Sequence, residues 1–163
     1  MKIKLLNLAI FQIGWIVCLL GGNVWAIAYT SAALLIHQRY VLNKSGEWKL
    51  IAIVVLAGSA WEILMLSSGL IFYPGFGPFG VPLWLICLWL LFATTFMHSL
   101  AWLDRYLWLA AGLAAVVGPF SYWTGVEISD ARFGPSMATS MMVMALGWAV
   151  LFPAGLLLAR RFK

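Results

Sequence analysis

The sequence is poor in charged residues, which make up only 9% of its 163 positions, whereas hydrophobic residues make up 64%. A soluble domain carries about 25% charged residues and needs them to cover its surface. The ten basic and five acidic side chains of this chain are too few to cover a water-soluble globule of its size. We therefore expect the protein to lie in an apolar solvent, the lipid bilayer.

The sequence also lacks the alternation of polar and apolar residues that a membrane β-barrel requires in each strand of about ten residues. It shows long unbroken apolar runs instead, for example at positions 50–71 and 81–97. Only helices and closed barrels satisfy their backbone hydrogen bonds inside lipid. The pattern therefore predicts an all-α protein, a polytopic bundle of transmembrane helices.

Cysteine is scarce, and the motifs of metal or cofactor binding are absent. Cys18 and Cys87 lie in apolar runs without a CxxC or Cys/His spacing, which favours two small side chains packed between helices. A disulfide between them stays open, since both fall in the predicted periplasmic half. No Walker, HExxH or GxSxG motif occurs, so we expect neither a metal nor another cofactor.

Six apolar segments are predicted to cross the membrane, each near the length of about 20 residues that a span needs. The expected helices cover residues 5–22, 24–38, 50–72, 81–103, 106–123 and 136–159. A tight turn at Gly21-Gly22-Asn23 is expected between the first two, and a polar loop that contains Glu47 before the third. Together they form a single integral-membrane domain over residues 1–163. Gln12 and Trp15 interrupt the first apolar stretch, so we expect it to be a retained helix and not a cleaved signal peptide.

The basic residues predict the orientation. With six crossings, nine of the ten lie on the side of the amino terminus, and Arg132 alone lies on the other. The nine are Lys2, Lys4, Arg39, Lys44, Lys49, Arg105, Arg160, Arg161 and Lys163. Cytoplasmic loops carry such an excess, so both termini are expected in the cytoplasm. Since these residues are needed for topology, the net charge of +5 does not indicate a nucleic-acid partner.

Glu62 is the main candidate functional residue. It lies near the middle of the expected helix 50–72, where a carboxylate costs about 2.5 kcal/mol or more on insertion scales. Gly58 and Gly69 share its helical face, and small residues allow close helix packing, so Glu62 is expected to point into the bundle. Residues expected at the same depth, as hydrogen-bond donors, are Gln12, Trp89 and Trp148. Two interpretations stay open: Glu62 ties helices together, or it carries a proton, acts as an acid or base, or binds an ion or substrate.

His98 is the second candidate, with Thr94 and Thr95 on a mildly polar stripe of the same expected helix. His37 should lie at a comparable depth. Because we find no third strong ligand on their helical faces, a metal site is disfavoured. Hydrogen bonding between helices is expected for His98, and an interfacial position for His37.

Tyr73 begins a segment at 73–80 in which prolines and glycines break the helical pattern. Two structures stay open for this aromatic segment: a lid over a lipid or another apolar substrate, or a simple turn in the outer headgroup region.

The order of these residues resembles a family of small bacterial inner-membrane proteins catalogued as a domain of unknown function. The resemblance covers nearly the whole chain and rests on Trp61-Glu62, Gly69, Tyr73, Val81-Pro82-Leu83-Trp84, Trp89, Thr94-Thr95 and His98-Ser99. The family is often found beside genes for cyclopropane fatty-acid synthesis, which implies the bacterial inner membrane and lipid metabolism. The order is also similar to membrane carotenoid hydratases and lycopene cyclases, which protonate isoprenoid double bonds with several intramembrane acids. This chain has one such acid.

Three functions follow as hypotheses. The first is a lipid-related enzyme or accessory protein whose central cavity holds Glu62 and His98 as catalytic residues. Its partners would be membrane lipids, with an apolar lipid or isoprenoid as substrate. The expected substrate contacts are Gln12, Tyr73, Trp89, Thr94 and Thr95. The second is a small proton-coupled transporter that uses Glu62, and the third is a scaffold without chemistry.

Overall fold

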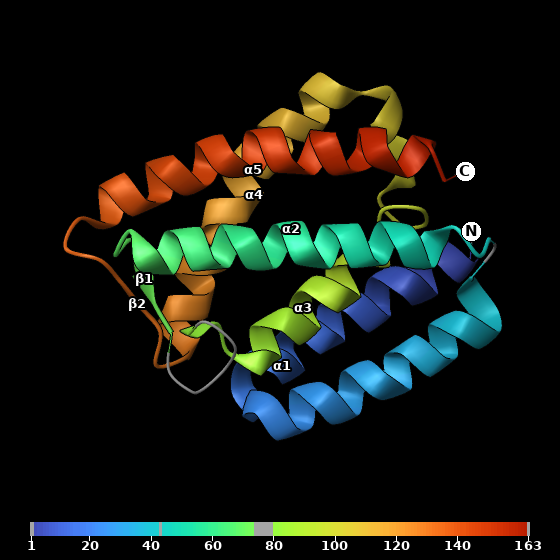
Figure 1. Cartoon of the computed structure of the whole chain (residues 1–163), viewed down its shortest axis with the longest axis horizontal. Coiled ribbons are helices and arrows are strands. Elements are labelled where there is room, and N and C mark those ends of the chain that lie inside the picture. The colour runs from blue at the N-terminus through green and yellow to red at the C-terminus, as the bar shows by residue number, and fades with distance from the viewer. Residues whose placement is uncertain (1, 43, 74–79, 163) are drawn as a thin grey trace.

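The computed structural model describes residues 2–42, 44–73 and 80–162, which form helices and one short antiparallel sheet (Figure 1). The α-helices are α1 (Lys2–Ile36), α2 (Glu47–Ser67), α3 (Leu83–Ala93), α4 (Leu107–Ile128) and α5 (Met137–Arg160). A π-helix, η1 (His37–Val41), follows α1, and a 3-10 helix, η3 (Ala101–Arg105), precedes α4. The strands are β1 (Ile71–Phe72) and β2 (Arg132–Phe133), in which Ile71 pairs with Phe133.

Four stretches of the described chain are long and apolar enough to cross a membrane: Lys2–Val41, Glu47–Ser67, Leu107–Ile128 and Met137–Arg160. Their outward faces are apolar too. The exposed fraction is 90% for Trp108, 71% for Leu56 and 66% for Leu146. Large apolar side chains so exposed suit lipid as the surrounding solvent. The all-helical, membrane-embedded class expected from composition is therefore supported.

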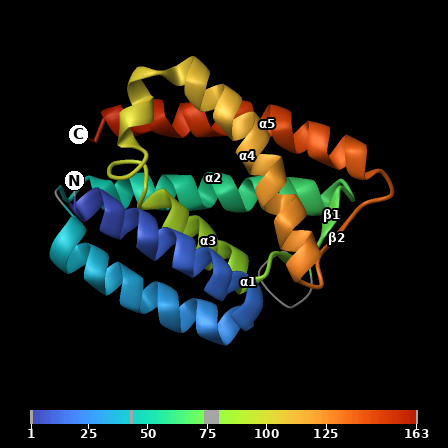
Figure 2. The same ribbon diagram turned by 180° about the vertical axis from the view of Figure 1, so that it is seen from behind.

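The helix α1 is a hairpin of two legs. Gly22 has φ 63° and ψ −165°, which breaks the helix between them, and a left-handed φ of this kind suits glycine. The second leg runs back beside the first (Figures 1 and 2). Asn23 fixes the turn, because its side-chain oxygen accepts a hydrogen bond of 3.0 Å from the backbone N–H of Trp84. The predicted turn at 21–23 is confirmed.

The predicted helix 81–103 is wrong in its second half, because α3 ends at Ala93. Thr94 and Thr95 turn their hydroxyl groups back onto the carbonyl oxygens of Leu91 and Phe92, at 2.7 and 2.6 Å. Such local bonds compete with the helical ladder. The following residues form turns as far as η3. We call residues 94–100 the broken segment.

Asn7, on the first leg of α1, holds the broken segment in place. Its amide nitrogen donates to the Thr94 carbonyl at 3.3 Å, and its side-chain oxygen accepts from the Ser99 hydroxyl at 2.7 Å. Non-helical backbone at membrane depth is tolerated where protein buries it. The broken segment meets that condition, since Thr95 and His98, like the Asn7 that holds the segment, are exposed by 3% or less.

The remaining helix boundaries differ from the predicted ones by a few residues, and this difference changes the position of Glu47. The predicted helices 106–123 and 136–159 correspond to α4 and α5, and α4 continues to Ile128. The predicted helix 50–72 is displaced, since α2 covers Glu47–Ser67 and Gly69, at φ 68°, lies beyond its end. Glu47 was expected in a polar loop and is instead a buried helical residue. Of the aromatic segment expected at 73–80, residues 74–79 lie outside the described residues.

The two ends of the molecule differ in what they contain. Both termini lie at one end, and β1 and β2 lie at the opposite end (Figure 1). There the backbone N–H of Gly134, the residue after β2, donates to the carbonyl of Leu70, the residue before β1, at 3.0 Å. Helices α2 and α5 run along the long axis, and α4 crosses them obliquely (Figure 2).

Candidate functional site

Glu62 lies on the inward face of α2 and is 1% exposed. Apart from the adjacent pair Leu50 and Ile51, the buried residues of this helix recur every three or four positions: Glu47, Leu50, Ile51, Val54, Gly58, Glu62 and Met65. That spacing forms one face of a helix. The predicted inward direction of Glu62 is confirmed, with Gly58 on the same face.

Three side chains donate hydrogen bonds to the Glu62 carboxylate. Tyr73 donates to Oε2 at 2.6 Å, and Tyr122 and the Trp89 indole donate to Oε1 at 2.5 and 3.0 Å. The Trp61 indole donates to the Tyr122 hydroxyl at 3.2 Å. We call these five residues the Glu62 network.

The chemistry of the donors fixes most proton positions in this network. An indole N–H can only donate, so Trp61 donates to the Tyr122 oxygen. The Tyr122 hydroxyl in turn donates its hydrogen bond to Glu62. The bond between Tyr73 and Oε2 is different, because a carboxylic acid could donate to the phenol oxygen. Burial raises the pKa of the Tyr73 phenol well above its usual range, and the charge of the neighbouring carboxylate raises it further. Tyr73 therefore keeps its own proton, while its oxygen can still accept a hydrogen bond from a protonated Glu62.

Glycines opposite the indole rings make the tight packing of the network possible. A Cβ atom at Gly58 would overlap the ring of Trp89, and one at Gly147 would overlap Trp61. Trp89 stacks on Trp148, with ring centroids 5.4 Å apart and planes 10° apart. The indoles are thus held between helices α2, α3 and α5, and this fixes the direction of their N–H groups.

Four residues of the Glu62 network, all except Trp61, form part of the wall of a cavity of about 650 Å³. Helices α1, α3, α4 and α5 supply most of the lining, which is largely apolar. The polar groups at the wall include Glu62, Tyr73, Tyr122 and Gln12. The buried indole N–H of Trp148, also at the wall, lies near the Tyr122 hydroxyl without full hydrogen-bond geometry. An apolar pocket with a few convergent polar groups is the usual form of a small-molecule site.

The residues predicted for the site separate into two groups. Tyr73 and Trp89 contact Glu62, and Gln12 lines the same cavity. The structure does not bring Thr94, Thr95 and His98 to this cavity: the two threonines bond to the end of α3, and His98 belongs to a second cluster. Their assigned roles stay predictions.

Sequence reasoning missed Tyr122 and Trp61. Both lie in apolar helical stretches, where an aromatic side chain is expected to serve for packing or for anchoring at the interface. Tyr122 carries no spacing signal relative to Glu62, since it is 60 residues away along the chain, and Trp61, the neighbour of Glu62 in the sequence, contacts Tyr122. A general rule could have helped: a buried carboxylate needs donors, and Tyr and Trp are the donors that this sequence offers.

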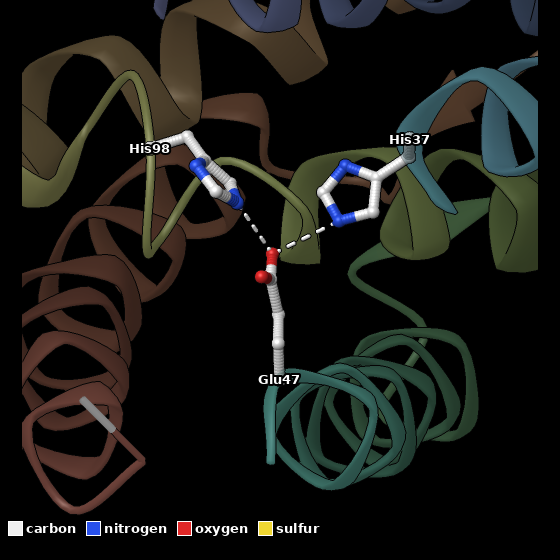
Figure 3. Close-up of side chains that lie close together, drawn as sticks. All are labelled: His37, Glu47 and His98. Atoms are coloured by element: carbon white, nitrogen blue, oxygen red, sulfur yellow. Dashed lines mark hydrogen bonds and ion pairs between the residues drawn. The ribbon is translucent and has the colours of Figure 1, made fainter. Parts of the chain in front are cut away.

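The second cluster consists of His37, Glu47 and His98 (Figure 3). The Nε2 atoms of His37 and His98 lie 3.0 and 2.8 Å from the same oxygen, Glu47 Oε1. The two rings are edge to face, with centroids 5.3 Å apart. The expected similar depth of the histidines is found. His37 is 3% exposed and so faces protein, while the interfacial depth expected for it stays a prediction.

A family model described as a protein of unknown function (DUF2878) matches residues 4–154 of the chain. The chain belongs to this family. No curated protein and no solved structure matches it. The family DUF2878 agrees with the resemblance to a domain of unknown function, and its description names no activity. The likeness to carotenoid enzymes and the gene neighbourhood have no support from the comparisons and stay predictions.

Proposed function

We propose that this member of DUF2878 is a bacterial inner-membrane protein that binds an apolar lipid or isoprenoid in the cavity beside Glu62, as an enzyme or as an accessory to one. The observation that carries the proposal is a single buried carboxyl group at the wall of a cavity of about 650 Å³ with a largely apolar lining. A cavity of this volume suits a ligand of moderate size.

The polar wall suggests how such a ligand would be oriented. The acyl or isoprenoid part would lie against residues such as Phe11, Leu88 and Phe92, and its polar or unsaturated part would face Glu62 and Tyr73. The Trp148 N–H offers a further donor to an acceptor group of the ligand. Because a carboxyl group can both gain and lose a proton, Glu62 is suited to exchange one with a bound molecule, and Tyr73 would hold it in place by a hydrogen bond in either form.

The orientation in the membrane belongs to the same proposal: six crossings, with both termini in the cytoplasm. Its support is the bias of nine basic residues against one and the shared end of the two termini (Figure 1). Reporter fusions after Asp104 and Arg161 should report cytoplasm, and a fusion after Ser129 should report periplasm. A periplasmic signal at Arg161 would contradict the number of crossings.

The test of the ligand is the lipid that remains bound to the purified protein. Wild-type protein, Glu62→Gln and Tyr73→Phe would be purified under identical conditions, and their extracts compared by mass spectrometry. We expect wild type to retain a defined apolar species, and both variants to retain several-fold less of it. Matched controls are Glu127→Gln and Tyr106→Phe, which change exposed residues. If all five proteins carry only the bulk lipids of the membrane, the cavity has no ligand of this class.

A second function, a proton-coupled transporter, is favoured by one observation: the broken segment at 94–100 interrupts the chain within the bundle. Transporters place discontinuous helices beside their binding sites. Reconstituted wild type would then acidify vesicles on addition of substrate candidates, and Glu62→Gln would not. A Glu62→Gln variant that is as active as wild type in every assay would exclude both functions and would favour a scaffold.

A further inference from the structure

The cluster of His37, Glu47 and His98 lies apart from the cavity and is not used by the proposed function. We propose that it is a binding site for a divalent first-row transition metal, with Zn²⁺ as the first choice. One ligand atom from each of the three residues lies within 4.8 Å of the others. All three side chains are buried, with exposed fractions of 3%, 0% and 3%.

The donor set fits this class of metal. Imidazole nitrogens and a carboxylate are ligands of zinc sites, at distances of about 2.0–2.2 Å from the ion. Two such ligands on a tetrahedral ion are about 3.3 Å apart. The two Nε2 atoms lie 3.0 and 2.8 Å from Glu47 Oε1. A few tenths of an ångström of side-chain movement would therefore admit the ion.

One buried polar atom of the cluster supports a ligand independently of its composition. Glu47 Oε2 has no hydrogen-bond partner among the described residues, because both imidazoles approach the other oxygen, Oε1. A buried polar atom without a partner costs about 1–3 kcal/mol. A metal would engage it, since a bidentate Glu47 and the two histidines supply four donor atoms. A simple imidazole–carboxylate network would leave Oε2 unused.

The positions of the ligands indicate a structural site. His37 lies on the π-helix η1, Glu47 begins α2, and His98 lies in the broken segment. Segments of π-helix, such as η1, are frequent at functional sites. An ion here would join three separate segments of the chain at the end that contains the termini (Figures 1 and 3). The burial of all ligands suits a closed site, in which metal binding contributes to folding.

The test is metal binding by the full-length protein, produced without a polyhistidine tag. The protein would be stripped with a chelator and titrated with Zn²⁺, and separately with Co²⁺, whose visible absorption reports its ligands. We expect one ion per chain and nitrogen and oxygen ligands by X-ray absorption. Glu47→Gln and His98→Gln should weaken binding at least about 10-fold, whereas Glu127→Gln should bind as wild type does.

A second measurement keeps the test decisive if the variants fold poorly. Chelation of wild type should lower its melting temperature, and added Zn²⁺ should restore it. If wild type binds no stoichiometric Zn²⁺ or Co²⁺ and its melting temperature is insensitive to chelator, the site does not exist. The cluster would then be a metal-free network of imidazoles and a carboxylate.

Discussion

Glu47 and Glu62 project from the same inward face of α2 and are both almost fully buried. They lie 15 positions apart, which is about 22 Å along the helix. Glu62 is surrounded by two phenols and an indole, and three hydrogen bonds engage both its oxygens. Glu47 faces two imidazoles, which both approach Oε1. One carboxylate therefore has its partners within the protein, and the other has an oxygen left for a ligand.

This difference shows that burial alone does not give a carboxylate its role. Phenols and indoles are neutral at physiological pH, so the Glu62 network can hold a proton or a polar ligand group at the cavity wall. Imidazoles are metal ligands and can also carry charge. The residue types around each carboxylate therefore distinguish the two sites on this helix: a site at the cavity wall around Glu62 and a site with metal-ligand composition around Glu47.

The largest expected effect comes from removing each carboxylate in turn. Glu47→Leu should destabilise the protein by about 3–5 kcal/mol, because it breaks a buried pair and leaves two imidazoles without a partner. Glu62→Leu should cost about 1–3 kcal/mol, because the donors that it abandons are neutral. Melting or chemical unfolding in detergent measures both. Equal losses would remove the energetic distinction between the two clusters.

A smaller effect is expected at the glycine beneath the Trp89 ring. Gly58→Ala should cost about 1–3 kcal/mol through overpacking and should displace Trp89 from Glu62. It should leave the cluster of His37, Glu47 and His98 unchanged. The control is Gly112→Ala on α4, where an added Cβ meets no atom, and alanine there should be neutral or stabilising by up to about 1 kcal/mol. Unfolding curves that coincide for the two variants would contradict the packing of α2 against α3.

The smallest effect is expected from a single hydroxyl of the Glu62 network. Tyr122→Phe removes one bond to Glu62 and the acceptor of the Trp61 N–H. We expect a loss of about 0.5–1.5 kcal/mol, together with a change in the near-ultraviolet signal of the indoles. Tyr106→Phe, at an exposed position, provides the control. If Tyr122→Phe changes neither quantity, the hydrogen bond between Tyr122 and Glu62 contributes nothing to stability.

The local signals in the sequence were sufficient for several features. The tight turn expected at Gly21-Gly22-Asn23 is found between the two legs of α1, where the left-handed φ of Gly22 suits glycine. Gly58 and Glu62 predicted the inward face of α2 because their spacing follows the helical period. Trp89 was predicted as a donor to Glu62 from depth alone, and the bond is found.

The sequence by itself determined that the chain is helical and membrane-embedded, because composition and long apolar runs depend on solvent and not on packing. Only the tertiary structure decided where α3 ends, since Asn7 holds Thr94 from 87 positions away. It also decided that Glu47, read as a loop residue, meets His37 and His98 in the interior. Contacts between distant segments leave no periodic pattern in the sequence, so their partners become visible only when the helices are packed together.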